Sequence, residues 1–419
     1  MKPTFAIVGG SIVGSVCAIL LDRLGFDVVV FEKSKNEEIP DRGAGIWLPK
    51  SLIDALVESR ILSRNFQSLS IQERPIYFQK TGSDEEILLT AHSIQASPVH
   101  WLNLYQDIKK HRPEKRVVYD AEVTHIESGE GVVGLTINGG EKRYFDYCIF
   151  ADGSRSLGRS HLFPDLEPIF TDTVVWRGNL NPASLETAER VLGKGLFYVN
   201  ERGHLLIYPI PRLMGSAAQH YEINWLFYER VDSTHALFKG SVEKVRRNIA
   251  KGHMPDEYRD YLHGLAETFL PTFPRKVVVS TKHPFMQSMH EILVPSYVKD
   301  NMCLVGDAST MLRAHTAAGT KKGIQDALAL GKCIKKNPNQ ILLALKQWNA
   351  TRYEFGKNQF ELGQALGGLF VTHAPHWPKL NKVQMDAQWL AATRGVCWYS
   401  KQNTHASVSE LLRFARRLR

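Results

Sequence analysis

The sequence contains little cysteine, and none of it is arranged as metal or disulfide sites usually are. Its five cysteines are scattered over 419 residues without CxxC spacing, which argues against a zinc site and a disulfide framework. A long apolar run is also missing, because the uncharged residues 4–21 contain three glycines and fall short of the roughly 20 apolar residues that a membrane span needs. Only Lys2 precedes this stretch as a basic residue, so a signal peptide is not indicated. We therefore expect a cytoplasmic protein without a metal or a membrane span.

The sequence has no concentrated patch of one charge. Its net charge is +9, but apart from the basic residues at 411–419 the excess is spread along the chain. No aromatic and basic reader motif accompanies this charge, so we expect no nucleic-acid partner. An anionic cofactor and a weakly acidic substrate explain the positive balance better. At 419 residues the chain exceeds the roughly 250–300 residues at which single cores stop growing, so we expect more than one core.

The N-terminal residues have the pattern of a dinucleotide-binding βαβ unit. An apolar run precedes GGSIVG at 9–14, and a helical stretch and a second apolar run follow. Gly9 permits the tight turn, Gly14 lets the helix approach the strand, and Glu32 ends the second strand where a ribose hydroxyl would bind. Ser11 stands at the middle glycine position, so its Cβ crowds the pyrophosphate and weakens the fingerprint.

A second cofactor-type turn lies in the segment 301–330. An apolar strand there delivers Gly306 and Asp307 to its carboxyl end, where ligands of open α/β sheets bind and an aspartate can accept hydrogen bonds from sugar hydroxyls. A helix opens next, and its N-terminal N–H groups favour an anion. The residues at this helix start are Ala318, Gly319 and Thr320. The combination suggests FAD.

A third turn of this kind follows an apolar strand in the middle of the chain. The run 145–163 leads into Asp152 and Gly153, and two arginines come next. Arg155 and Arg159 either orient the turn and approach a phosphate or form surface salt bridges, which is the commoner role of an arginine after a turn. Three such turns in one chain together indicate a bound dinucleotide.

The order of these turns resembles the class A flavoprotein aromatic hydroxylases, the fold family of p-hydroxybenzoate hydroxylase. Five further segments resemble the branch that includes 2,6-dihydroxypyridine 3-hydroxylase: RGAGI (42–46), VVWRGNL (174–180), INWLFY (223–228), HPFMQ (283–287) and AHTAAGTKKG (314–323). The resemblance implies an FAD-dependent monooxygenase that uses NADH or NADPH and O2 to hydroxylate an electron-rich aromatic or hydroxypyridine-like small molecule. In this family oxygen adds to the reduced flavin at C4a, and the resulting hydroperoxide hydroxylates the ring.

The resemblance also implies an α/β fold. A Rossmann-like FAD-binding domain with a mostly parallel sheet would carry an inserted antiparallel substrate sheet and C-terminal helices. Alternating runs at 204–211 and 221–229 independently predict antiparallel strands. The expected parts are residues 1–70, 100–165 and 285–345 for the FAD-binding domain, 71–99 and 168–280 for the substrate-binding sheet, and 346–419 for the helical segment.

Three residues depart from the family pattern. Trp101 stands where relatives have an arginine, which leaves Gln106 on the same helix to reach the flavin. Ala314 replaces a proline, and Lys321 replaces a neutral residue and is expected to be a solvated lysine on the helix surface. The cofactor contacts that the resemblance implies are Gly9, Gly10, Ser11, Gly14, Glu32, Lys33, Arg42, Gly43, Gln106, Asp152, Gly306, Asp307, Ala318, Gly319 and Thr320.

A side chain that deprotonates the substrate hydroxyl would make the ring more nucleophilic. His315 is the preferred candidate, although a hydrogen bond that stabilises its loop is an equally good reading. Tyr208, His220 and Trp225 are further candidates on the substrate sheet, where a one-residue register shift would reverse the faces. A dehydrogenase or oxidase of the same fold, and a non-catalytic flavin-binding regulator, stay open as alternatives. Family resemblance alone also implies a homodimer.

Overall fold

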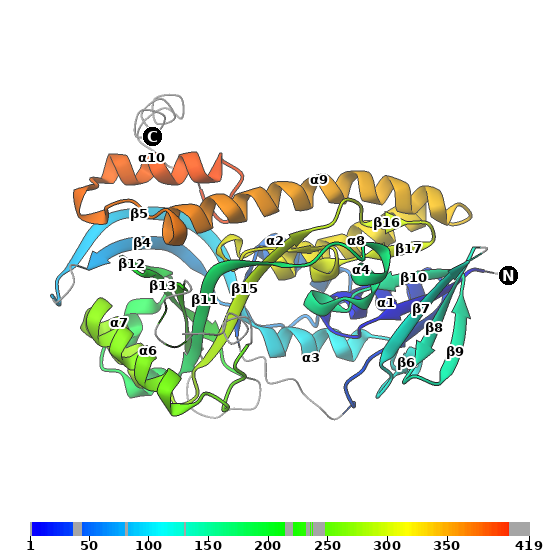
Figure 1. The fold of residues 1–419 in the computed structure, drawn as a ribbon, viewed down its shortest axis with the longest axis horizontal. Coiled ribbons are helices and arrows are strands. Elements are labelled where there is room, and N and C mark those ends of the chain that lie inside the picture. The colour runs from blue at the N-terminus through cyan, green and yellow to red at the C-terminus, as the bar shows by residue number, and fades with distance from the viewer. Residues whose placement is uncertain are drawn as a thin grey trace.

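Two β-sheets form the frame of the protein, and a long helix, α9, runs across both (Figure 1). The computed structural model describes residues 2–36, 44–79, 83–129, 131–213, 221–231, 235, 237 and 248–401. Within these residues there are a six-stranded, a nine-stranded and a three-stranded sheet. The predicted fold class, with a mostly parallel sheet and a separate, mainly antiparallel one, is confirmed.

The six-stranded sheet is built around β1 (Thr4–Val8), which pairs in parallel with β2 (Asp27–Phe31) and β10 (Tyr147–Phe150). β10 pairs in parallel with β17 (Met302–Leu304), so strands far apart in the sequence end at one edge. These strands are mostly apolar and buried, as is typical of a parallel sheet between helices. The other elements here are β6 (Val117–Val118), β16 (Val298–Lys299), α1 (Ile12–Arg23), α2 (Lys50–Glu58), α3 (Trp101–His111), α4 (Leu157–Leu162) and α8 (Gly319–Lys336).

The nine-stranded sheet has the order β18-β15-β11-β14-β13-β12-β4-β5-β3 and is antiparallel except where β12 meets β4. Helices α6 and α7 pack on one face, and α9 and α10 pack on the other. The predicted antiparallel strands at 204–211 and 221–229 are confirmed as β13 and β14. The bounds are β3 (Gly45–Leu48), β4 (Ile71–Gln79), β5 (Glu86–His100), β11 (Ile169–Leu180), β12 (Leu196–Asn200), β13 (Gly203–Pro211), β14 (Tyr221–Arg230), β15 (Phe285–Leu293), β18 (Thr310–Met311), α6 (Asp256–Phe269), α7 (Thr272–Val279), α9 (Ile341–Gly367) and α10 (Lys382–Thr393).

The sheets do not divide at the expected domain limits. β3 and β15 lie in segments assigned to the FAD-binding domain, yet both pair within the nine-stranded sheet. A small antiparallel sheet of β7 (Val123–Gly129), β8 (Val132–Ile137) and β9 (Glu141–Phe145) precedes β10. The domain limits themselves stay a prediction.

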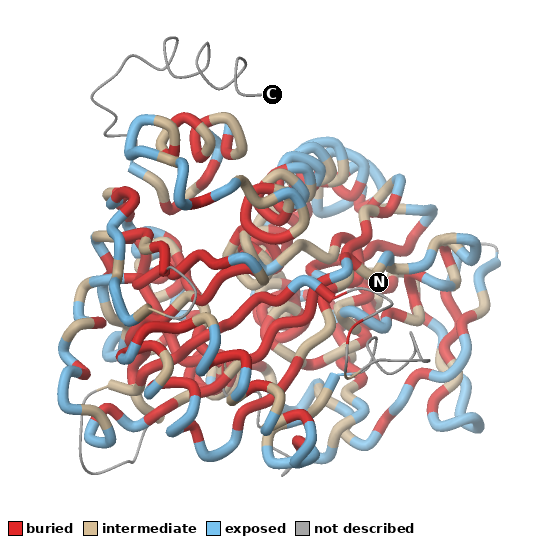
Figure 2. The backbone as a smooth tube through the Cα atoms, turned by 60° about the vertical axis from the view of Figure 1, so that its left-hand side comes forward, coloured by how far each residue is buried: buried red, intermediate tan, exposed pale blue. Residues whose placement is uncertain are grey.

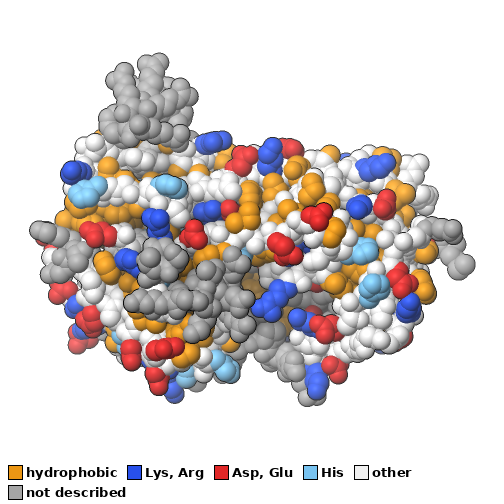
Figure 3. Space-filling model, viewed as in Figure 1, with side chains coloured by type: hydrophobic (Ala, Val, Ile, Leu, Met, Phe, Trp, Pro, Cys, Tyr) orange, Lys and Arg blue, Asp and Glu red, His pale blue; other side chains and the backbone are white. Residues whose placement is uncertain are grey.

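Buried residues are concentrated along the strands and the inner sides of the helices (Figure 2). All five cysteines are free thiols, and four of them are buried as small core residues. Over the described part of the chain, no helix combines the length and apolar character needed to cross a membrane. On the face drawn in Figure 3, basic and acidic side chains are interspersed and do not form one basic area.

Candidate functional site

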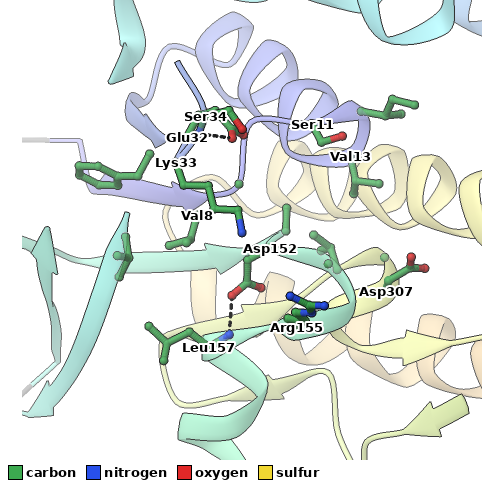
Figure 4. Close-up of a pocket in the computed structure, with 18 of the residues that line it drawn as sticks. Val8, Ser11, Val13, Glu32, Lys33, Ser34, Asp152, Arg155, Leu157 and Asp307 are labelled. Atoms are coloured by element: carbon green, nitrogen blue, oxygen red, sulfur yellow. Dashed lines mark hydrogen bonds between the residues drawn. The ribbon is translucent and has the colours of Figure 1, made fainter. Parts of the chain in front are cut away.

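The carboxyl ends of β1, β2, β10 and β17 open into a cavity of about 290 Å³, which we call the cofactor cavity (Figure 4). The N-termini of α1 and α8 also reach it. The cavity therefore unites the three turns that long segments separate in the sequence. Of the predicted cofactor contacts, it is lined by Gly9, Ser11, Glu32, Lys33, Asp152, Gly306, Asp307, Gly319 and Thr320.

Two glycines let the first turn close. Gly9 has a φ of 98°, in the left-handed region, and a Cβ on it would lie 2.5 Å from the carbonyl oxygen of Ala151. A Cβ on Gly14 would lie 1.9 Å from the carbonyl oxygen of Gly9. Neither position has room for a side chain, so the tight turn and the close approach of helix to strand follow from these two residues.

Glu32 and Arg112 hold the glycine-rich turn in place. The Glu32 carboxylate accepts hydrogen bonds from the backbone N–H groups of Gly10, at 2.7 Å, and Ser34, at 2.9 Å. The Arg112 side chain is fully buried and donates to the carbonyl oxygen of Gly10 at 2.8 Å and to Ser15 Oγ at 3.2 Å. Nothing in the local sequence signals Arg112, because it reaches the turn from the end of α3.

Asp152 offers an unused acceptor at the cavity. Its Oδ2 accepts hydrogen bonds from the N–H groups of Leu157, at 2.8 Å, and Gly158, at 3.3 Å. Its Oδ1 is buried without a hydrogen-bond partner, and burial raises the pKa of this carboxyl group. A buried acceptor of this kind suits a hydroxyl or N–H group of a ligand.

Arg159 joins the second and third turns. It is buried and donates to the carbonyl oxygens of Ser154, at 2.5 Å, and of Asp307 and Ala308, both at 3.3 Å. Of the two roles considered for this arginine, it therefore has the one that orients the turn. Arg155 is exposed and lines the cavity, where its charge can approach a phosphate.

A buried ion cluster holds the turn at Gly306 in place through hydrogen bonds to the backbone of Gly306. Lys322 Nζ lies 2.7 Å from Asp326 Oδ2, and Arg352 Nε lies 2.7 Å from Asp326 Oδ1. The same carboxylate accepts a hydrogen bond from Gly306 N at 3.1 Å, and Lys322 donates to Gly306 O at 3.1 Å. No local pattern in the sequence indicates this cluster, since Asp326 and Arg352 lie on different helices.

The prediction for Lys321 is wrong. Its side chain is buried, with Nζ 4.8 Å from the centre of the Phe355 ring and 5.7 Å from that of Trp398. Burial lowers the pKa of Lys321 to about 8. The C-terminal residues that cover this part of α8 could not be placed there from the sequence.

The cofactor cavity fits FAD. Neither α1 nor α8 has a side chain that caps its N-terminus, so backbone N–H groups and the positive end of each helix dipole are available to an anion such as the pyrophosphate. Asp152 Oδ1 is an unpaired acceptor, and the exposed Asp307 stands at a strand end where a polyhydroxyl chain can lie. The helix N-termini thus suit the anionic pyrophosphate, and the carboxylate oxygens suit the hydroxyl and N–H groups of a flavin dinucleotide.

Some predicted contacts do not line the cavity. Gln106 does not, whereas Trp101 and Tyr105, with ring centres 5.5 Å apart and stacked, do. Gly10, Gly14 and Ala318 are not among the residues that line it either. The predicted residues Arg42, Gly43 and His220 lie outside the described residues.

A second, smaller cavity of about 30 Å³ lies between the nine-stranded sheet and the C-terminal helices; we call it the aromatic cavity. His315 lines it, with its ring centre 4.6 Å from that of Tyr228 and 5.2 Å from that of His204. Both ring nitrogens of His315 are buried without a partner, so its side chain does not stabilise the loop by hydrogen bonding. The lining residues are Trp47, Arg74, Phe197, His204, Leu206, Tyr228, Ala314, His315, Ala317, Leu366, Phe370 and Tyr399.

The other catalytic candidates are less well placed. Tyr208 is buried on the same side of the sheet, 5.2 Å from the Trp47 ring centre, but does not line the aromatic cavity. Trp225 packs in the core on the opposite face, where its Nε1 donates to Thr281 Oγ1 at 2.8 Å. Trp225 is therefore not part of this site. Among the described residues, no group of three or more histidine, cysteine or acidic side chains could hold a metal.

Known proteins share both the sequence pattern and the fold. Residues 7–36 match the family model described as an NAD(P)-binding Rossmann-like domain. The chain is 25% identical over 370 residues to 2,6-dihydroxypyridine 3-monooxygenase of Paenarthrobacter nicotinovorans, covering 85% of this chain and 89% of the relative. It is 25% identical over 350 residues to a salicylate hydroxylase of Pseudomonas putida, covering 78% and 76%. The solved 2,6-dihydroxypyridine-3-hydroxylase from Arthrobacter nicotinovorans has a TM-score of 0.77 at 21% identity, covering 91% and 96%.

The chain has the α/β fold of the solved 2,6-dihydroxypyridine-3-hydroxylase, with a Rossmann-like nucleotide-binding unit at residues 7–36. The predicted resemblance to the class A flavoprotein aromatic hydroxylases is confirmed, since these relatives are hydroxylases and monooxygenases of aromatic and hydroxypyridine compounds.

Proposed function

We propose that this protein is an FAD-dependent, NAD(P)H-dependent monooxygenase that hydroxylates an electron-rich aromatic or hydroxypyridine-like small molecule with O2. The main support for the proposal is that one short segment of the chain contributes lining residues to both cavities. Ala314, His315 and Ala317 line the aromatic cavity, and Gly319 and Thr320 line the cofactor cavity. A ligand in the aromatic cavity would therefore lie beside the helix start that faces the cofactor.

The cofactor would be held by the turns already described. Bound FAD would accept a hydride from NADH or NADPH and activate O2. The N-termini of α1 and α8 would stabilise its anionic groups, Glu32 and Asp307 would bind its hydroxyl groups, and Asp152 would offer its free Oδ1. Gln106, Arg42 and Gly43 stay predictions as cofactor contacts.

His315 would receive a hydrogen bond from the substrate hydroxyl. Burial lowers the pKa of His315 to about 3, so its imidazole is neutral at physiological pH and offers one nitrogen lone pair. A hydroxyl group that donates to this lone pair gains electron density at oxygen, which makes the ring more nucleophilic. The surrounding Tyr228, Phe370 and Phe197 rings exclude water from this hydrogen bond.

A cytoplasmic location and a homodimer belong to the same proposal. The five free thiols, four of them buried, are in keeping with a reducing compartment. The dimer rests on family resemblance alone, and size-exclusion chromatography with light scattering tests it.

The deciding experiment combines a flavin spectrum with product analysis. Purified protein is expected to be yellow or to take up added FAD, and a hydroxylated aromatic should accelerate anaerobic flavin reduction by NADH or NADPH. Under an atmosphere of ¹⁸O₂ and with NADH or NADPH present, one labelled oxygen atom should enter the product. Flavin reduction that yields only hydrogen peroxide would instead indicate an oxidase, and bound flavin that no nicotinamide reduces would indicate a non-catalytic flavin-binding protein.

A further inference from the structure

The aromatic cavity is too small for the ring that the proposed reaction requires. Its volume of about 30 Å³ has room for roughly two water molecules, whereas an engineered cavity that accepts benzene measures roughly 150 Å³. Both ring nitrogens of His315 are buried at this cavity without a hydrogen-bond partner. A ring can therefore bring a hydroxyl group to His315 through this cavity only after part of the cavity wall has moved.

One part of this wall comes from residues 395–401, which we call the cover segment. It follows α10, which lies over β5 (Figure 1). Tyr399 lines the cavity, and its hydroxyl donates to the carbonyl oxygen of His315 at 3.3 Å. The neighbouring Trp398 donates from Nε1 to the carbonyl oxygen of Thr316 at 3.0 Å. The cover segment thus closes the cavity and holds the backbone of the loop that carries His315.

The cover segment is joined to the nine-stranded sheet by a short stretch of backbone pairing. Gln95 N donates to the carbonyl oxygen of Tyr399 at 2.8 Å, and Lys401 N donates to that of Ser93 at 2.9 Å. By comparison, β13 and β14, which form another part of the wall, face each other over nine residue pairs. An element held by few hydrogen bonds opens at a lower free-energy cost than a long strand pair. The cover segment is therefore easier to displace than the strands of the wall.

The backbone on both sides of this contact has left-handed residues. Arg394 and Gly395, which precede the rest of the cover segment, have φ angles of 47° and 72° and are exposed. Exposed residues at a helix end can absorb a change in backbone dihedrals. Ala317, in the loop that the cover segment holds, has a φ of 47°, which is costly for a residue with a Cβ. Such a conformation persists where the surrounding structure holds it in place.

We propose that the cover segment is a gate of the aromatic cavity, which turns about Arg394 and Gly395 and releases the carbonyl oxygens of His315 and Thr316 to admit a ring-sized ligand. When it closes again, Tyr399 excludes water from the cavity. This inference rests on the proposed function, because that function requires a ring hydroxyl to reach His315. It adds an opening step before substrate binding, as in enzymes with mobile lids.

Trp398→Phe and Tyr399→Phe test the gate, because each keeps a ring and removes one hydrogen bond of the closed form. The readout is the rate at which diethyl pyrocarbonate acylates His315, followed by mass spectrometry on purified protein with FAD added. Loss of one hydrogen bond should make this labelling about fivefold faster. Hydrogen exchange at the amides of Gln95 and Lys401 should rise by a similar factor, since the same opening exposes them. Labelling at the wild-type rate in both variants would contradict the gate.

The matched control is Trp377→Phe. Trp377 Nε1 donates to the carbonyl oxygen of Asn200 at 3.2 Å, so this variant loses the same kind of hydrogen bond outside the cover segment. It should leave the labelling rate of His315 unchanged, and the exposed His253 serves as the internal standard for the reagent. If Trp377→Phe accelerates the labelling as much as Trp398→Phe does, general loosening is the cause and the gate is refuted.

A disulfide tests the gate in the opposite direction. Ile94 and Ser400 form an antiparallel bridge, and the backbone hydrogen bonds on either side make them a non-hydrogen-bonded pair. The Cα atoms of such a pair are about 4.5 Å apart, which a disulfide can span. Ile94→Cys combined with Ser400→Cys should therefore tether the cover segment when oxidised. The oxidised protein should label His315 about tenfold or more slowly than the same protein after reduction, because the cross-link restricts the open form. Equal rates would overturn the proposal.

These measurements separate the gate from the proposed function, because neither labelling nor hydrogen exchange requires NAD(P)H or turnover. Labelling that follows the expected order in a protein that hydroxylates no aromatic compound would remove the proposed function and keep the gate. Hydroxylation at the same rate in the oxidised and reduced forms of the disulfide variant would remove the gate and keep the proposed function.

Discussion

The two cavities differ in whether backbone or side chains form their walls. The cofactor cavity is formed by backbone turns at strand ends, by helix N-termini and by glycines whose Cβ positions are already filled. The aromatic cavity is formed by side chains from β3, β4, β12, β13, β14, the segment 314–317 and the C-terminal part of the chain. Backbone geometry leaves a short, ordered pattern in a sequence, whereas a wall of side chains from distant strands leaves none. The first site could therefore be predicted by motif and the second could not.

Gly14→Ala should have the largest effect and tests whether backbone geometry alone forms the cofactor cavity. The new Cβ would meet the carbonyl oxygen of Gly9 at 1.9 Å, so the turn must open and overpacking should cost about 1–3 kcal/mol or more. We expect the FAD content of the purified protein to fall to near zero, with a lower Tm. Gly264→Ala is the control, because nothing lies within 4 Å of its Cβ position on α6. Flavin content that stays normal in Gly14→Ala would contradict the assignment.

His315→Gln should separate the two cavities functionally. Loss of this buried hydrogen-bond acceptor is expected to lower kcat by about 10- to 100-fold, because the hydrogen bond strengthens as charge develops on the substrate oxygen. FAD affinity should stay unchanged, since His315 does not line the cofactor cavity. Stopped-flow hydroxylation and flavin titration measure the two quantities, and the exposed His253→Gln is the control. A parallel loss of FAD would show that the cavities are not separate in function.

Lys321→Met concerns the helix start that both cavities share. The folded pKa of Lys321 is lowered to about 8, whereas an unfolded lysine has a pKa of about 10.4. Between these values the unfolded state binds a proton that the folded state lacks, so wild-type stability should gain up to about 3 kcal/mol as the pH rises from 8 to 10.4. The variant should lack this gain, whereas Lys332→Met, at an exposed position of the same helix, should keep it. Urea unfolding at both pH values measures the difference, and an equal gain in all three proteins would show that Lys321 is not the cause.

Asp152→Asn should have the smallest effect, because asparagine keeps an oxygen that can accept from Leu157 N. Loss of the charge should weaken FAD binding by about tenfold, as expected for one hydrogen bond to a charged group. Burial raises the pKa of Asp152, so the wild-type carboxyl should protonate as the pH falls and the difference should shrink. Flavin titrations at pH 5 and pH 8 test this, with the exposed Asp165→Asn as control. A difference that grows at low pH would contradict this role.

The features of the fold and the site that could be predicted from the sequence are those that local patterns encode. The turn at Gly9, the acidic residue at Glu32 and the paired strands at 204–211 and 221–229 all depend on neighbours within a few tens of residues. Arg74 is different, because its surroundings come from Trp389 and Tyr399 near the other end of the chain. Lys321 was misjudged for the same reason, since Trp398 covers it. Sequence patterns do not indicate which distant segment will fold over a helix.

The order of strands in the six-stranded sheet has a consequence for how the protein is made. β1 and β2 leave the ribosome early, but the other neighbour of β1 is β10, and the next strand, β17, ends only at Leu304. Until β10 is made, β1 has an open edge with unpaired backbone groups, and β10 then presents the open edge until β17 follows; open edges invite pairing with other chains. Synthesis of this protein therefore passes through a long interval in which protection of one strand edge by chaperones, or simply fast translation, decides between folding and aggregation.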